Sequence, residues 1–369
     1  MTTTTGHQAS LAASSKSTLG PIDTDVHEIL PSGRIDELIP YLPDHWKRYV
    51  TDFGFSGPPN PLPWTRAPAR VRAEWQIAGA AQGSDPDKFI ADLFDGLGVA
   101  AGILNNVAMS VSAMRGAFEL AAAVATAYND YSIEHWLEKD PRLFGSVYVV
   151  AQDPAQAARE IDRVGSHPKI VQVFLPIVSD RQYGQRQYWP IYDAAVRNDL
   201  VIAFHHGSDL TGVFGFPNYF SEWHTTVLPA AVSAQIGSLL FNGVFDRYPT
   251  LKVCCLESGF GWMPSLMFRA DHQRRQFREE IPWVKHKPSE LLREHVRMAT
   301  QPMEDYDARQ LMQVMDLMGS EDMIMFSSDY PHYDADLPAR SLPSGLSHNV
   351  RDKIMRENAL MTYPKLKDV

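Results

Sequence analysis

The amino-acid sequence predicts an α/β protein and, within that class, a (β/α)8 TIM barrel. Three observations indicate this fold: the 369 residues contain eight short apolar runs, each run is apolar along nearly its whole length, and helical patterns separate the runs. Strands buried on both faces of a parallel sheet have this continuous apolar character, and helices supply the crossovers between them. An open, doubly wound sheet is the alternative fold for the same pattern.

The eight expected strands are the short apolar runs, which are typical of buried strands when helical patterns follow them. The runs lie at 21–28, 98–106, 142–150, 169–177, 200–209, 251–259, 295–303 and 323–331.

Helical patterns fill the intervals between these runs. In 117–140 the apolar residues recur at steps of three and four, and the pattern ends before Pro141. The segment 153–165 begins with Asp-Pro and ends with Gly165, which are typical signals for the start and the end of a helix. The remaining patterns lie at 187–199, 225–249, 288–295 and 306–319.

One long insertion, at about 31–90, interrupts the alternation between the first and second strands. Its segment 51–72 contains five prolines, so regular helix or strand is not expected there, whereas EWQIAGAAQ (74–82) is helix-like. In a barrel this insertion is a loop on the catalytic face, either a surface embellishment or a lid or subunit contact. We expect residues 1–20 to be a disordered tail and 21–369 to form one domain.

Composition excludes several classes of protein. The net charge of −10 does not favour binding to nucleic acid or to an anionic membrane surface, both of which need clustered Lys and Arg. No stretch reaches the roughly 18–20 apolar residues of a membrane span. The two cysteines are the adjacent Cys254 and Cys255, so a disulfide framework is excluded and a reducing cytoplasm is the expected location.

Polar side chains of the kinds that bind metals stand at the carboxyl ends of four expected strands. Each strand is apolar up to that point, and the carboxyl ends of barrel strands form the active-site face. Any one such residue is more often a structural hydrogen-bonding group, but four strand ends together favour a site. The residues are Asp25 and His27 in the first run, His205 and His206 in the fifth, Glu257 in the sixth and Asp329 in the eighth, with His332 shortly after it.

These side chains predict a divalent metal. Asp25 and His27 are two residues apart, so both can point into the barrel mouth. Carboxylates grouped in a low-dielectric mouth would repel one another and take up protons, and a divalent cation removes that cost. Mixed imidazole and carboxylate ligands suit Zn²⁺, Mn²⁺ or Fe²⁺ better than Ca²⁺ or Mg²⁺.

Four motifs carry a resemblance to a known family. The chain resembles the amidohydrolase superfamily, and within it the amidohydrolase-related branch of aminocarboxymuconate semialdehyde decarboxylase and γ-resorcylate decarboxylase, from Ile22 to about Pro364. The resemblance implies metal ligation by Asp25, His27, His205 and Asp329, with one metal or two per chain. The motifs are IDTDVHE, FHHGSD, GVFDRYPTLKVCCLESGFGWMP and FSSDYPH.

The chain departs from this pattern at two positions. Asp25 replaces the usual first histidine, which shifts the site toward oxygen ligands and so toward Mn²⁺ or Fe²⁺. The family's His-Gly-Gly motif after strand six is replaced by Glu257-Ser258-Gly259. Glu257 is therefore expected to be either a general base or a ligand to a second metal.

Substrate contacts are expected around the same mouth. The aromatic and glycine-rich segment 212–224 could wall a pocket, with Tyr219 and His224 as candidate contacts, or it could pack on itself. His206 is expected beside the metal ligand His205 as a substrate contact. His332 is either a substrate contact or a surface residue.

These observations predict a metal-dependent enzyme that hydrolyses or non-oxidatively decarboxylates a small carboxylated organic substrate. A water or a substrate oxygen would be polarised by the metal, Asp329 would exchange a proton, and Glu257 would assist. The alternatives are a dinuclear Fe/Mn oxygenase (hydroxylase) component on the same scaffold and a non-catalytic barrel subunit. We expect a homo-oligomer or a hetero-oligomer with a related barrel subunit.

Overall fold

Eight parallel strands form a single sheet in which each strand pairs with the next one along the chain. The computed structural model describes residues 19–55, 57, 71–109, 117–206, 217–367 and 369. The strands are β1 (Ile22–Val26), β2 (Ala101–Leu104), β3 (Leu143–Tyr148), β4 (Ile170–Pro176), β5 (Val201–His205), β6 (Val253–Cys255), β7 (Val296–Ala299) and β8 (Ile324–Met325). Each lies within one of the eight predicted runs, so the predicted barrel is confirmed.

Backbone hydrogen bonds between the first strand and the segment around β8 bring the two edges of the sheet together. The Thr24 amide donates to the Phe326 carbonyl at 3.1 Å, and the Asp329 amide donates to the Asp25 carbonyl at 3.1 Å. Val26 and Tyr330 form a parallel bridge between the same segments. The carboxyl ends of β1 and β8 therefore lie side by side, although they come from opposite ends of the chain.

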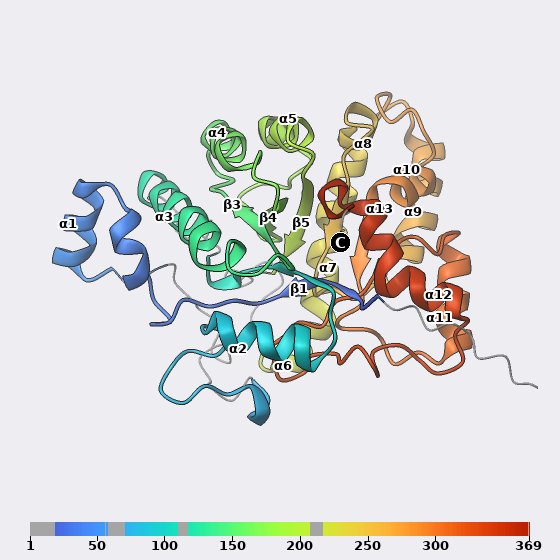
Figure 1. The fold of residues 1–369 in the computed structure, drawn as a ribbon. Coiled ribbons are helices and arrows are strands. Elements are labelled where there is room, and N and C mark those ends of the chain that lie inside the picture. Colours follow the sequence, from blue (N-terminus) through green and yellow to red (C-terminus); the bar gives the residue numbers. More distant parts are fainter. Residues whose placement is uncertain (1–18, 56, 58–70, 110–116, 207–216, 368) are drawn as a thin grey trace, which may run out of the picture.

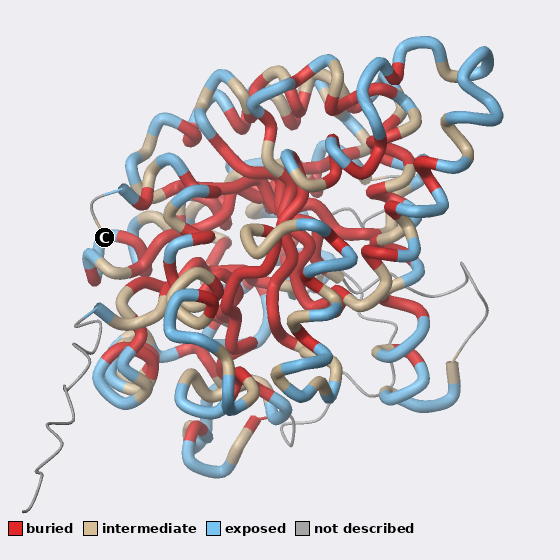
Figure 2. Tube along the Cα trace, turned by 90° about the vertical axis from the view of Figure 1, so that its right-hand side faces the viewer, coloured by how far each residue is buried: buried red, intermediate tan, exposed pale blue. Residues whose placement is uncertain are grey.

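Two apolar clusters account for the burial of the strands on both faces. One lies between the strands and the surrounding helices; the other fills the cylinder and includes residues of the C-terminal segment. Figure 2 shows the buried strands at the centre and the exposed residues on the outer turns and helices. The cluster inside the cylinder includes Ile22, Ala101, Phe144, Val171, Ala203, Cys254, Ala299, Met325, Ala359, Tyr363 and Leu366.

The helices lie around the strands, with α1 projecting at the left of Figure 1. They are α1 (Asp44–Phe53), α2 (Pro86–Ile90), α3 (Phe118–Ser132), α4 (Pro154–Val164), α5 (Trp189–Arg197), α6 (Phe220–Glu222), α7 (Leu228–Phe241), α8 (Val244–Arg247), α9 (Met263–Phe277), α10 (Pro288–His295), α11 (Ala308–Met318), α12 (His348–Asp352) and α13 (Asn358–Thr362). No helix in the described part of the chain has the length and apolar character needed to cross a membrane.

Local signals explain where the predicted helices begin. In α4 the side chain of Asp153 accepts a hydrogen bond from the Gln156 amide at 3.0 Å, and Pro154 occupies the first turn. In α11 Asp307 and Gln310 form a capping box, and the helix ends at Gly319 with φ +71°. Both helices agree with the sequence prediction.

The insertion between β1 and β2 corrects one expectation. Only a 3₁₀ turn, Ala73–Trp75, forms near the helix-like segment 74–82, because Gly79 and Gly83 adopt φ of +76° and +77° in turns that end any helix. Most of the proline-rich stretch (56 and 58–70) and most of the expected tail (1–18) lie outside the described residues. The division into a tail and one domain stays a prediction.

Candidate metal centre

The end of β1 places Asp25 and His27 in the barrel mouth, where Asn105 contacts both. The Nδ1 of His27 donates to the Asn105 carbonyl at 2.5 Å, and the Asn105 side-chain amide donates to Asp25 Oδ1 at 2.8 Å. The Nε2 of His27 lies 3.6 Å from Asp25 Oδ1. Both predicted ligands are therefore held by the residue that follows β2.

His205 ends β5 and faces Asp25 across the mouth. Its Nε2 lies 3.2 Å from Asp25 Oδ2, and its Nδ1 donates to the His206 carbonyl at 2.8 Å. Phe174 of β4 stacks on the ring with centroids 5.6 Å apart. The preferred ligand of the histidine pair therefore points into the centre through its Nε2.

Asp329 follows β8 and lies between two imidazoles. Its Oδ1 is 2.6 Å from His27 Nε2, and its Oδ2 is 2.8 Å from His332 Nδ1. Asp329 adopts φ +61°, a left-handed conformation that a residue with a side chain rarely takes. The backbone is thus strained at a point where the carboxylate faces the centre.

Glu257 follows β6 and lies among three imidazoles. Its Oε2 lies 2.5 Å from His206 Nε2 and 3.4 Å from His205 Nε2, and its Oε1 lies 3.2 Å from His224 Nε2. It also adopts a positive φ, +44°. Both acidic residues that were predicted to have a catalytic role therefore sit on a left-handed backbone.

Two buried ligand-type atoms at the centre have no hydrogen-bond partner among the described residues. They are Asp25 Oδ2 and His205 Nε2, which lie 3.2 Å apart. Leaving such groups unpaired in a buried site is costly. A cation satisfies carboxylate and imidazole atoms together, so the donor set fits a divalent metal. The residues form three overlapping sets, and within each set the ligand atoms lie within 4.8 Å of one another. The sets are Asp25, His27 and His205; His27, Asp329 and His332; and His205, His206 and Glu257.

The electrostatics of the centre attract positive charge. Burial by itself lowers the pKa of His27, but Asp25, Asp329 and Glu257 outweigh it and raise that pKa well above the ordinary value. Burial raises the pKa of Asp329, but His332 and His27 together lower it to about 2. The centre thus keeps the Asp329 carboxylate ionised and favours positive charge at His27, which suits a site for a cation.

Glu257 is held ionised in the same way. Burial raises its pKa, but His206, His224 and His205 outweigh this and hold it well below the usual range. Burial lowers the pKa of His206, and it lowers that of His224 less than Glu257 raises it. The imidazoles around Glu257 therefore differ in their affinity for protons.

The structure brings eight of the nine predicted site residues together. The ninth, Tyr219, is 73% exposed at the start of α6, and its predicted substrate contact stays a prediction. Residues 212–216 of the segment 212–224 lie outside the described residues. Neither cysteine is suited to act as a thiolate ligand, because burial raises the pKa of Cys254 to about 12 and raises that of Cys255 well above its ordinary value.

Sequence reasoning missed the residues that hold the ligands. Asn105 contacts Asp25 and His27, as described above, and in turn receives hydrogen bonds from Ser146 and Gln172. Asp334 lies near the acidic groups of the mouth, which together with its burial raise its pKa. The sequence signal for Asn105 is its position after the apolar residues of the second run. Other runs carry predicted metal ligands at the corresponding position.

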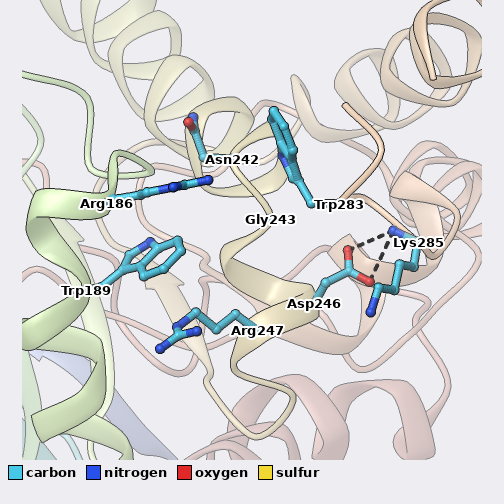
Figure 3. A pocket seen from close by; sticks show the side chains of 8 residues that line it. All are labelled: Arg186, Trp189, Asn242, Gly243, Asp246, Arg247, Trp283 and Lys285. Atoms are coloured by element: carbon cyan, nitrogen blue, oxygen red, sulfur yellow. Dashed lines mark hydrogen bonds between the residues drawn. The ribbon is translucent and has the colours of Figure 1, made fainter. Parts of the chain in front are cut away.

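A cleft of about 440 Å³ on the outside of the barrel lies apart from these residues. Figure 3 shows Arg186 and Trp189 on one side of it and Trp283 and Lys285 on the other. None of its lining residues belongs to the centre described above.

A closed parallel barrel with imidazole and carboxylate side chains converging at the carboxyl ends of its strands is the arrangement of metal-dependent barrel enzymes. The amidohydrolase family model matches residues 51–365, and the chain belongs to this family. The resemblance drawn from the motifs is confirmed.

Curated relatives are decarboxylases. The chain is 25% identical to γ-resorcylate decarboxylase of a Polaromonas species over 258 residues, which cover 66% of this chain and 76% of that protein. It is 30% identical to 2-amino-3-carboxymuconate-6-semialdehyde decarboxylase of Dictyostelium discoideum over 95 residues, 26% of each chain.

Solved structures have the same fold. The 5-carboxyvanillate decarboxylase of Sphingomonas paucimobilis matches with a TM-score of 0.71 and 21% identity, over 94% of this chain and 99% of that one. The dihydroxybenzoic acid decarboxylase of a Polaromonas species, solved with manganese and the inhibitor 2-nitroresorcinol, matches with a TM-score of 0.64 and 20% identity, over 95% and 98%. At this level of identity the likeness establishes the fold.

Proposed function

We propose that this protein is a divalent-cation-dependent decarboxylase of a small hydroxylated aromatic acid. The observation that carries the proposal is that ligand atoms from β1, β5 and the segments after β6 and β8 form three overlapping groups at the barrel mouth, and the atoms of each group lie within 4.8 Å of one another. The decarboxylase relatives and the manganese in a structural neighbour support it.

Asp25, His27, His205 and Asp329 would hold the cation. Two carboxylates and two imidazoles favour Mn²⁺, with Fe²⁺ or Zn²⁺ as other candidates. When bound, the cation would supply positive charge that orients the substrate and polarises one of its oxygens. Asn105 keeps the Nδ1 hydrogen of His27 occupied, which leaves Nε2 for ligation.

Non-oxidative decarboxylation breaks one carbon–carbon bond and forms one carbon–hydrogen bond. The carboxylate leaves as CO₂, its bonding electrons stay on the ring carbon, and a proton must reach that carbon. Asp329 would pass this proton on, and the His332 and His27 imidazoles that contact its two oxygens would supply it. The reaction needs no oxidant.

Glu257 would supply a second negatively charged carboxylate, on the side of the mouth opposite Asp329. Three imidazoles surround it, so a proton can be exchanged between Glu257 and His206 or His224 over distances of 2.5 and 3.2 Å. His206 and His224 are the predicted substrate contacts on the Glu257 side of the mouth, and His332, which contacts Asp329, is the predicted contact on the other side. Imidazole N–H groups suit the carboxylate and phenol oxygens of a hydroxybenzoate.

The test begins with metal analysis of protein purified without chelator, followed by reconstitution with Mn²⁺. Loss of CO₂ is then measured with 2,6-dihydroxybenzoate and with 5-carboxyvanillate, the substrates that the neighbours' names indicate. We expect Mn²⁺-dependent CO₂ release from one of these acids or a close analogue. Bound metal with no CO₂ release from any hydroxybenzoate would refute the proposal.

One observation favours a second candidate function, a dinuclear Fe/Mn oxygenase. His206 and Glu257 form a ligand-type group with His205, beside the group of Asp25, His27 and His205. This candidate predicts two Fe or Mn per chain and O₂ consumption, and Glu257→Gln would lower the metal content to one. One metal and no O₂ uptake would exclude it.

Assembly is part of the proposal. We infer a homo-oligomer, or a hetero-oligomer with a related barrel subunit, and sedimentation of the purified chain measures which forms. A chain that binds no metal and acts only within a complex would be a non-catalytic subunit instead.

A further inference from the structure

A line of hydrogen bonds runs through the inside of the barrel from the C-terminal segment to the candidate metal centre. The Tyr363 hydroxyl donates to Gln172 Oε1, Gln172 Nε2 donates to Asn105 Oδ1, and Asn105 Nδ2 donates to Asp25 Oδ1, each at 2.8 Å. All four side chains are buried. The interior of such barrels is usually filled by branched apolar residues, so a polar line there is unusual.

The direction of every hydrogen bond in this line follows from the carboxylate at its end. A carboxylate can only accept, so Asn105 must turn its NH₂ group toward Asp25 and its oxygen toward Gln172. Gln172 must then present its own NH₂ group to Asn105, which leaves its oxygen for the Tyr363 hydroxyl. Ser146 Oγ, 2.7 Å from Asn105 Oδ1, supports the same orientation.

The line determines which atoms face the centre. Because Asp25 Oδ1 is occupied by Asn105, the free oxygen Oδ2 faces His205 Nε2 at 3.2 Å. The main-chain carbonyl of Asn105 holds His27 Nδ1 as well. One residue thus orients two predicted ligands, and two further side chains orient that residue.

We propose that Tyr363, Gln172 and Asn105 are positioning residues that present Asp25 to the cation, so that the C-terminal segment is part of the metal site. This inference rests on the proposed function, since it takes the centre to be a cation site. Groups that hold metal ligands in place typically change metal affinity by about 10- to 100-fold when they are removed.

Tyr363→Phe tests the proposal because it removes one oxygen atom and keeps the aromatic ring, which belongs to the apolar cluster inside the barrel. We expect the Mn²⁺ dissociation constant, measured by titration calorimetry, to rise about 10-fold. The matched control is Tyr192→Phe: Tyr192 is equally buried and its hydroxyl also donates one hydrogen bond, to the Tyr183 carbonyl at 2.7 Å, but on α5. We expect the control to bind Mn²⁺ like the unchanged protein.

A second variant cuts the line in its middle. In Gln172→Met an apolar side chain of similar length replaces the amide, so Asn105 Oδ1 loses the Gln172 donor and the Tyr363 hydroxyl loses its acceptor. We expect a larger loss of Mn²⁺ affinity than in Tyr363→Phe. Thermal unfolding of each variant separates lost affinity from lost structure.

The outcomes separate this inference from the proposed function. If Tyr363→Phe binds Mn²⁺ like the unchanged protein, whatever its unfolding temperature, the line is only structural and the inference is wrong. If the unchanged protein binds Mn²⁺ and decarboxylates nothing, the proposed function fails while the affinity test still stands. If the unchanged protein binds no divalent cation, both fail.

Discussion

The candidate metal centre and the outer cleft of Figure 3 both contain charged and aromatic side chains, but the two regions differ in how these side chains are buried and paired. In the cleft Arg247 lies over the Trp189 ring at 4.4 Å and Trp283 Nε1 donates to the Phe241 carbonyl at 2.8 Å, while Trp189 Nε1 is the one lining atom that is buried without a hydrogen-bond partner among the described residues. In the centre, two buried atoms that could both bind a cation, Asp25 Oδ2 and His205 Nε2, face each other without a hydrogen bond to any described residue.

This difference favours the centre over the cleft as the candidate functional site. Polar groups at an open cleft are stabilised by water and need no ligand, whereas buried ligand atoms without partners raise the free energy of the folded protein unless something binds them. Left-handed backbone at Asp329 and Glu257 adds to that cost. Variants in the two regions should therefore differ sharply.

Asp329→Ala should have the largest effect. It removes a predicted ligand and the predicted proton donor together, so we expect kcat/KM for decarboxylation to fall about 10⁴-fold or more. The control is Asp316→Ala on the exposed side of α11, which should retain activity. Substantial activity in Asp329→Ala would show that the centre is not the reaction site.

Glu257→Gln should have the next largest effect. The amide keeps the shape but removes the charge that faces three imidazoles, and we expect kcat to fall about 10²- to 10⁴-fold. Glu160→Gln is the matched control, since Glu160 is also buried and pairs with Arg163 at 2.7 Å, on α4. Equal losses in both variants would indicate damage to the fold rather than to the chemistry.

Removal of the cation should lower the free energy of unfolding, and this effect should depend on intact residues of the metal centre. A ligand present at 100 times its dissociation constant stabilises the folded state by about 2.7 kcal/mol, so a chelator should lower the unfolding temperature by a corresponding amount. In Asp329→Asn the effect of Mn²⁺ on unfolding should shrink. The same effect of Mn²⁺ in that variant would place the cation elsewhere.

Arg247→Ala in the cleft should have the smallest effect. It removes an exposed side chain that stacks on Trp189, so we expect kcat and Mn²⁺ affinity to stay within about twofold of the unchanged protein. The measurement is the decarboxylation assay with Mn²⁺ titration. A large loss of kcat or of Mn²⁺ affinity would show that the cleft affects the centre, which would contradict the difference drawn between the two regions.

Much of the fold and part of the centre could be predicted from the sequence. The eight strands were predictable because buried parallel strands are apolar along their length, and Asp25, His27, His205 and Asp329 because polar residues rarely end such runs. The segment 74–82 was mispredicted because its composition resembles a helix, while Gly79 and Gly83 form turns.

The sequence by itself determined in which segments the strands lie and which polar side chains follow them, because these are properties of neighbouring residues. Only the tertiary structure decided that His27 meets Asp329, 302 positions away, and that Tyr363 reaches Asp25 through Gln172 and Asn105. Such contacts depend on how the barrel closes and on which face each side chain takes, and no local pattern records either.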